Sequence, residues 1–175
     1  MIRTTEGICE PVVLLDVHAA DLHDAVVGLA ATFEQTLDVD AEYREAIEGT
    51  LRREMDQGPD VLENSVAVIH ATLEAPGPPV AALIRLDDDS PAHAPDGTAI
   101  RYAWVLLSND RTHPRLSLAA EFAKLMHEPT FREATLAAPT QGALLRVYEE
   151  ALSRKVGLVD MPPGLRYSGR LFGGM

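Results

Sequence analysis

The chain has 175 residues, of which 46% are hydrophobic and 5% aromatic, and its formal net charge is −12. This length supports one domain with its own core, and the negative charge opposes binding to nucleic acid or to anionic lipid. No apolar run is long enough to cross a bilayer, and the N-terminus lacks the apolar core of a signal peptide. Because Cys9 is the only cysteine, an internal disulfide and a multi-cysteine metal site are excluded.

The N-terminal third predicts one strand followed by two helices. Residues 11–16 form a short apolar run bounded by Pro and Asp, which is typical of a buried strand. Apolar residues at helical spacing then predict a helix over roughly 20–36. Asp38 and Asp40 are candidate caps for a second helix, which should end near residues 58–59, a Gly-Pro pair.

The middle of the chain changes to a strand-like pattern. Residues 65–73, 80–86 and 100–107 are apolar runs, separated by the Pro-rich segment 76–79 and by the acidic, Pro-rich stretch 87–97. The short connections suit antiparallel pairing of these three strands, whereas the first strand of the chain needs a crossover. A mixed sheet is therefore expected.

Helical signals return in the C-terminal third. A helix is expected from Pro114 to about Met126, a short one from Pro129, and a last one capped by Thr140. The fold class is thus α/β, with a mixed sheet of about four to five strands flanked by helices. Residues 1–157 form the domain, and residues 158–175, which include Pro162-Pro163-Gly164, form a linker.

The last residues carry a first resemblance. Gly169-Arg-Leu-Phe-Gly-Gly-Met175 is similar to the G-R-x-F-G-G-[LM] signature of the bicarbonate transporters, which include the anion exchangers. Residues 12–16, 101–107 and 142–145 resemble further segments of that family's cytoplasmic domain, in the same order. The resemblance implies that the chain is such a domain, and that it stops where the membrane part would begin.

The middle strand carries a second resemblance, to a structural relative of that domain. Residues 65–74 are similar to the active-site strand of the mannitol/fructose-type enzyme IIA of the bacterial sugar phosphotransferase system, or PTS. This resemblance implies an enzyme IIA-like fold, with His70 as acceptor of phosphate from the carrier protein HPr. It places Arg53 beside the phosphate and His113 near a second histidine of the family. Ile69 stands where that family has proline.

These residues also have ordinary structural interpretations. A histidine in an apolar strand is usually a satisfied core or rim residue, and Arg53 fits a solvent-facing helix surface. His113 could cap a helix or lie in a loop. Residues 87–89, three consecutive aspartates, lack a glycine-containing ligand loop and predict a solvated turn. The remaining histidines lack metal-ligand spacing, so no metal or cofactor is expected: His18, His23, His93 and His127.

Two functions follow, and the first is the leading interpretation. It is a regulatory and assembly domain, without catalytic activity, beneath a transporter for bicarbonate or another inorganic anion at the cytoplasmic face of the membrane. Its partners would be its own transmembrane domain and cytosolic regulators. The full transporter would be a homodimer, but residues 157–165 are too short for a dimerisation arm, so the isolated domain would be monomeric or weakly dimeric.

The alternative is an enzyme, a phosphohistidine carrier of the enzyme IIA type with His70 as acceptor and HPr as donor. A phosphoryl acceptor needs a neutral imidazole nitrogen for in-line attack, and positive charge around the phosphoryl oxygens, which Arg53 could supply. A hybrid is a third hypothesis, in which phosphorylation of His70 regulates a membrane domain.

Overall fold

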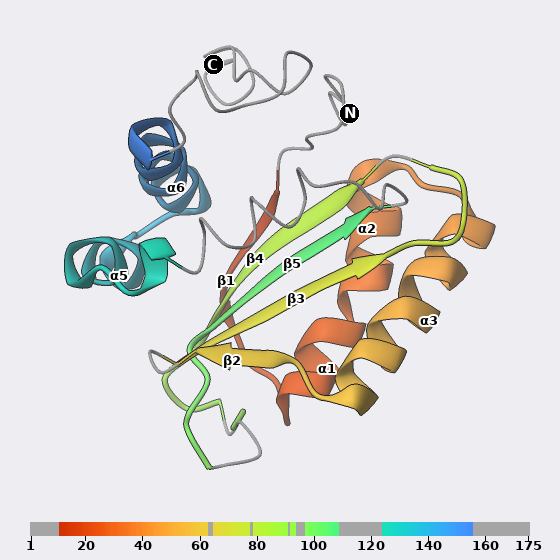
Figure 1. Ribbon diagram of the computed structural model, residues 1–175, viewed down its shortest axis with the longest axis horizontal. Helices are drawn as coiled ribbons and strands as arrows, with labels where there is room; N and C mark the ends of the chain where they lie inside the picture. Colours follow the sequence, from red (N-terminus) through yellow and green to blue (C-terminus); the bar gives the residue numbers. More distant parts are fainter. Residues whose placement is uncertain are drawn as a thin grey trace.

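The computed structural model describes residues 11–62, 65–77, 79–90, 92–93, 97–108 and 124–155. Figure 1 shows a sheet with helices on both of its sides. The strands are β1 (Val12–Val17), β2 (Asp60–Leu62), β3 (Val66–Thr72), β4 (Val80–Leu86) and β5 (Tyr102–Ser108). The helices are α1 (Leu22–Val27), α2 (Leu29–Leu37), α3 (Ala41–Gln57), α5 (Pro129–Ala137) and α6 (Gln141–Lys155). None of these helices is long and apolar enough to cross a membrane.

The five strands are arranged in the order β1-β4-β5-β3-β2. β1 is parallel to β4 and β3 is parallel to β5, whereas β4 pairs antiparallel with β5 and β2 pairs antiparallel with β3. The predicted mixed sheet is confirmed, and β2 is a short strand that the sequence did not predict.

One predicted pairing is wrong. β3 and β4 are consecutive in the chain, but they do not pair with each other, because β5 lies between them. The connection over residues 73–79 is too long for a tight hairpin, and it contains three prolines. It spans two strand spacings, about 10 Å. The antiparallel pairing of β4 with β5 is as predicted.

α1, α2 and α3 cover one face of the sheet (Figure 1). The predicted helix over 20–36 is divided at Gly28, which ends α1 and begins α2. A side chain at Gly28 would bring its Cβ to 3.0 Å from the carbonyl oxygen of Asp24, so this junction favours glycine. Asp38 ends α2 in a left-handed conformation, with φ of 52°, and does not cap the following helix.

α3 begins and ends where the sequence indicates. The Asp40 carboxylate accepts a hydrogen bond of 2.7 Å from the backbone N–H of Tyr43, which satisfies one of the free donors of the first turn. Gly58 follows the helix with φ of 90°, a conformation that side chains other than glycine rarely adopt. Because Pro59 then prevents a further helical turn, the chain enters β2 at Asp60.

α5 and α6 lie on the opposite face of the sheet from α1–α3 (Figure 1). α5 has proline in its first turn, as predicted, and the hydroxyl of Thr140 accepts a 3.1 Å bond from the backbone N–H of Ala143 in α6. Their apolar side chains form a second core with Trp104 and with other side chains on that face. The predicted helix from Pro114 to Met126 lies outside the described residues, except for its helical end at 124–126.

A buried guanidinium joins these two helices to the sheet. Arg85 of β4 is 7% exposed. Its Nη1 donates to the carbonyl oxygens of Thr135, Leu136 and Ala138, at 3.1, 3.1 and 2.7 Å. Its Nε and Nη2 donate to Oδ1 of Asp16, at 3.3 and 3.1 Å. One cation therefore binds the C-terminal end of α5, where the helix dipole is negative, together with β1.

Asp16 reaches this guanidinium from an irregular position in β1. Its φ is 54°, and the register of β1 against β4 shifts between Leu14 and Val17. A left-handed aspartate in a strand is uncommon. The ion pair with Arg85 gives a physical reason for it, because the bulge directs the carboxylate toward the guanidinium.

The first prediction concerns Gly77, between β3 and β4. A Cβ at this position would lie 2.5 Å from the ring of Tyr43, which is 5% exposed and packed in the core. We expect Gly77→Ala to reduce the free energy of unfolding by about 1–3 kcal/mol, measured by urea denaturation. Gly49→Ala is the control: no atom lies within 4 Å of its added Cβ, and it should raise the stability by about 0.5–1 kcal/mol. Equal effects of the two changes would contradict the close approach.

The second prediction concerns Arg85. Arg85→Met keeps a long side chain but removes the donors to three helix-end carbonyls and to Asp16. We expect the unfolding free energy to fall by about 3 kcal/mol, and amide exchange in α5 and α6 to increase more than in α3. Arg52→Met on the exposed surface of α3 should change stability by less than about 0.5 kcal/mol. Uniform exchange throughout the domain would argue against a local role for Arg85 in holding these helices.

Candidate functional site

His70 lies near the end of β3, and its side chain is 29% exposed. It is paired with Leu106 of β5, which belongs to the core on the α5–α6 face. Val66 and Val68 belong to the same core, whereas Ala67, Ile69 and Ala71 belong to the core under α1–α3. Because strand side chains alternate between faces, His70 points to the α5–α6 face of the sheet.

The neighbour of His70 in β2 is an aspartate. Asp60 is paired with Val68, so its side chain lies on the same face as His70. Its Oδ2 is 3.9 Å from Nε2 of His70, and the carboxylate is 79% exposed. This distance is too long for a hydrogen bond but short enough for an electrostatic interaction. A histidine beside a carboxylate is an arrangement that can supply a nucleophilic or proton-accepting nitrogen.

Arg53, the second residue predicted for the site, belongs to α3. It is an exposed residue of α3, and its Nη2 donates to the hydroxyl of Thr50 at 3.5 Å. α3 packs on the face of the sheet opposite to the one that carries His70. His113 lies outside the described residues. The roles predicted for Arg53 and His113 at a phosphoryl site therefore stay predictions.

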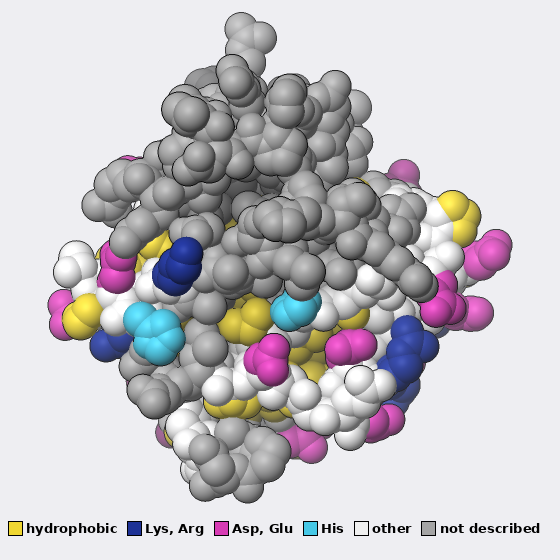
Figure 2. All heavy atoms as spheres, viewed as in Figure 1, with side chains coloured by type: hydrophobic (Ala, Val, Ile, Leu, Met, Phe, Trp, Pro, Cys, Tyr) yellow, Lys and Arg dark blue, Asp and Glu magenta, His cyan; other side chains and the backbone are white. Residues whose placement is uncertain are grey.

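The surface combines charged and apolar side chains. On the face seen in Figure 2, a histidine lies beside acidic side chains and next to exposed hydrophobic side chains near the middle of the molecule. Such a mixture can bind the surface of a partner protein, because apolar area and charge are both accessible.

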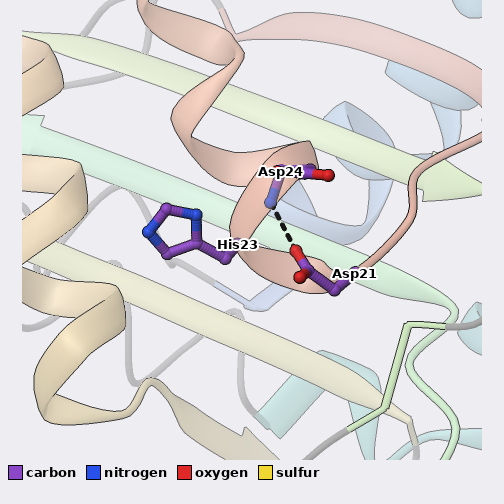
Figure 3. A group of neighbouring side chains, drawn as sticks. All are labelled: Asp21, His23 and Asp24. Carbon is purple, nitrogen blue, oxygen red and sulfur yellow. Dashed lines mark hydrogen bonds between the residues drawn. The ribbon is translucent and has the colours of Figure 1, made fainter.

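A second group of acidic and histidine side chains lies at the start of α1 (Figure 3). One potential ligand atom from each of Asp21, His23 and Asp24 lies within 4.8 Å of the others. The Asp21 carboxylate already accepts a 2.7 Å hydrogen bond from the backbone N–H of Asp24. Its role as the N-cap of α1 explains this group without a metal ion.

Charged residues also meet at the end of β4. His18 Nδ1 lies 3.0 Å from Oδ2 of Asp87, and the guanidinium of Arg101 pairs with the Asp88 carboxylate. Residues 88–89 form a turn, as the sequence predicts. Two of the three aspartates therefore have a basic partner, His18 or Arg101. This pairing indicates a structural role for the acidic run at this end of the sheet.

Tyr102 of β5 belongs to the second core, and its hydroxyl oxygen is buried. Burial raises the pKa of Tyr102, and this effect is opposed by the Thr135 hydroxyl and by the positive charges of Arg85 and Arg101. Within the described part of the chain, no group lies in normal hydrogen-bond geometry to the Tyr102 oxygen. Ionisation of this phenol is therefore unfavourable in the folded chain.

Two residues that make notable contacts in the structure, Arg85 and Asp60, were not predicted from the sequence. Arg85 could have been noticed as the single charge in an otherwise apolar strand, because such a residue is buried only with partners. Asp60 gives no comparable signal. It lies ten positions before His70, and only the register of β2 against β3 shows that the two side chains meet.

No family model and no curated protein matches the sequence. The fold, however, is similar to solved structures of PTS enzyme IIA proteins. The nitrogen regulatory protein IIA-Ntr of Neisseria meningitidis has a TM-score of 0.62 and 18% identity, over 79% of this chain and 90% of that one. A protein described as a PTS IIA of Streptococcus mutans has a TM-score of 0.62 and 21% identity, over 89% and 93%.

A third similar structure is a complex. The mannitol enzyme IIA of Escherichia coli, solved with phosphorylated enzyme IIB, has a TM-score of 0.59 and 17% identity, over 79% of this chain and 94% of that one. At these identities the likeness concerns the fold. The α/β fold with a five-stranded mixed sheet and enzyme IIA-like neighbours is thus as predicted.

The third prediction concerns the pH dependence of stability. The folded-state pKa of Tyr102 is raised above its unfolded value of about 10. Its contribution to stability is therefore fully present below pH 10, and it is lost as the pH rises through the folded-state pKa. We expect Tyr102→Phe to leave stability at pH 7 within about 0.5 kcal/mol and to reduce the loss of stability above pH 10. Urea denaturation across pH 7–11 measures both; identical alkaline profiles would show that Tyr102 ionises freely.

Proposed function

We propose that the chain is a phosphocarrier domain of the enzyme IIA type, with His70 as the phosphoryl acceptor. The observation that carries this proposal is the position of His70: a partly exposed imidazole, with a carboxylate nearby, on β3 of a fold that resembles enzyme IIA proteins. Its partners would be an HPr-type phosphoryl donor and an acceptor protein of the enzyme IIB type. The solved complex of the mannitol enzyme IIA with phosphorylated enzyme IIB supports the second partner by analogy.

The chemistry needs one nucleophilic nitrogen and a phosphoryl group presented in line with it. A lone pair of the His70 imidazole attacks the phosphorus atom of the phosphorylated donor. The bond between phosphorus and the donor's nitrogen breaks, and the donor imidazole keeps that electron pair and takes up a proton. In the second half-reaction a nucleophilic side chain of the acceptor protein forms the new bond to phosphorus, the N–P bond at His70 breaks, and the imidazole keeps that electron pair.

Arg53 and His113 are the further members of the proposed site. They would contribute positive charge or hydrogen bonds to the phosphoryl oxygens. The support for Arg53 is the resemblance alone, since its described contact is to Thr50 in the layer on the other side of the sheet. The support for His113 is likewise its sequence position.

The comparisons favour this function over the leading interpretation from the sequence. The similar structures are enzyme IIA proteins, and none of those described above is a transporter domain. The segment 169–175, which carries the G-R-x-F-G-G-[LM] part of the transporter resemblance, lies outside the described residues. A membrane domain as partner, and bicarbonate or anion transport as function, remain predictions from the sequence resemblance.

The fourth prediction tests the acceptor. The full chain is incubated with enzyme I, HPr and ³²P-labelled phosphoenolpyruvate, and acid-labile label is measured. We expect labelling of the wild type and a reduction to background, at least about tenfold, in His70→Ala, because the nucleophile is absent. His93→Ala is the control: it removes another exposed histidine and should keep the wild-type level.

Two results would contradict the acceptor assignment. Equal labelling of the wild type and His70→Ala would place the phosphoryl group elsewhere. An unlabelled wild type, with HPr from several bacteria and with the small donor phosphoramidate, would exclude a phosphocarrier function for the chain. Circular dichroism of both variants controls for folding.

A further inference from the structure

The extended pairing of β3 continues past its last residue. β3 ends at Thr72, but the backbone N–H of Leu73 still donates to the carbonyl oxygen of Ser108 in β5, at 2.8 Å. The Leu73 side chain is 1% exposed and belongs to the core under α1–α3. The chain after His70 is therefore held against the sheet for one residue more than the strand itself.

The side chains that follow His70 alternate between two sides. Those at odd positions lie in or against the core under α1–α3: Ile69, Ala71, Leu73 and Ala75. Glu74 and Pro76, between and after them, are exposed. Because successive side chains of an extended chain point to opposite sides, these two continue the side that carries His70. Glu74 follows His70 by four residues, which is about 13 Å of extended chain.

Gly77 anchors the far end of this segment. A Cβ at Gly77 would lie 2.5 Å from the ring of Tyr43, so the backbone itself packs against a side chain that is buried near the start of α3. In Figure 1 the connection runs from the end of β3 to the start of β4 at the end of the sheet. The ring of Pro76 also restricts its own φ. The segment 73–77 is thus attached at both ends, and it presents Glu74 and Pro76 on a preformed backbone.

We propose that Glu74 and Pro76 form a docking rim for the phosphoryl donor. The partner is the HPr-type protein of the proposed function, and it would place a basic and an apolar side chain, both close to its phosphoryl group, on this rim. The inference rests on the proposed function, because it names the surface that presents the donor to His70.

The charge and the rigidity of the rim support this role. A protein that carries a phosphoryl group needs basic side chains close to it, and these can pair with the carboxylate of Glu74. The net charge of −12 attracts a basic partner from a distance, but a local carboxylate is needed to orient it. Because the backbone of segment 73–77 is already ordered, little conformational entropy is lost when the partner binds.

The fifth prediction separates docking from chemistry. Phosphorylation rates of the full chain are measured against the concentration of phosphorylated HPr, which enzyme I and phosphoenolpyruvate maintain. We expect Glu74→Lys to raise KM for HPr about tenfold, with a small change in kcat, because a rim charge acts on association. Added salt should reduce the difference from the wild type. With phosphoramidate, a small donor that needs no docking surface, the effect should be at least about fivefold smaller.

Two further variants complete the experiment. Glu45→Lys makes the same charge change at an exposed position of α3, on the opposite side of the sheet, and should change KM by less than about twofold. Pro76→Gly removes the apolar ring and frees the backbone, so it should raise KM about threefold. Circular dichroism of each variant controls for folding.

The possible outcomes distinguish this inference from the proposed function. An unchanged KM in Glu74→Lys, or an equal rise in Glu45→Lys, would overturn the docking rim and leave the phosphocarrier function intact. An equal loss of labelling from HPr and from phosphoramidate in Glu74→Lys would overturn the rim as well, because the residue would then act on His70 itself. A wild type that neither donor labels would overturn the proposed function and the docking rim together.

Discussion

The attachment of α5 and α6 to the sheet depends on one buried guanidinium. Three carbonyl oxygens at the end of α5 and the carboxylate of Asp16 all converge on Arg85. Carbonyls at a helix end have no partners within the helix, and a buried cation without partners is strongly destabilising. The guanidinium of Arg85 and the carbonyl oxygens of the helix end therefore satisfy each other's need for hydrogen-bond partners. One side chain of β4 thus binds the end of α5 to the sheet, beside the apolar packing of the second core.

The two ends of α3 and the start of α6 were predictable because their signals are local, whereas the division of the first helix at Gly28 was not predicted. Asp40, Gly58 and Thr140 act within one turn of their own helices, so sequence spacing alone indicates them. The order of the strands in the sheet could not be predicted in this way, because strand pairing depends on residues that are far apart in the sequence. β3 pairs in parallel with β5, about 36 residues later, although β4 is closer along the chain. Arg85 likewise finds its carbonyl partners about 50 residues away.

The residues of the candidate site show the same difference between local and long-range signals. His70 was identified through the resemblance of residues 65–74 to an enzyme IIA strand, and its side chain is partly exposed on β3. The location of Arg53 depends on the packing of α3, whose buried side chains lie against the sheet face opposite to the one that carries His70. Asp60 could be connected with His70 only through the register of two strands.

The order of the strands has a consequence for how the domain assembles. β1 pairs only with β4, and β2 pairs only with β3, among the described strands. Until β5 enters between them, the sheet is two separate two-stranded pieces, each with an open edge of unpaired backbone groups. A chain emerging from the ribosome therefore cannot close its sheet before residue 108, although four of its five strands are already outside. We expect such a nascent chain to bind a chaperone, because its unpaired strand edges could otherwise pair with those of another copy.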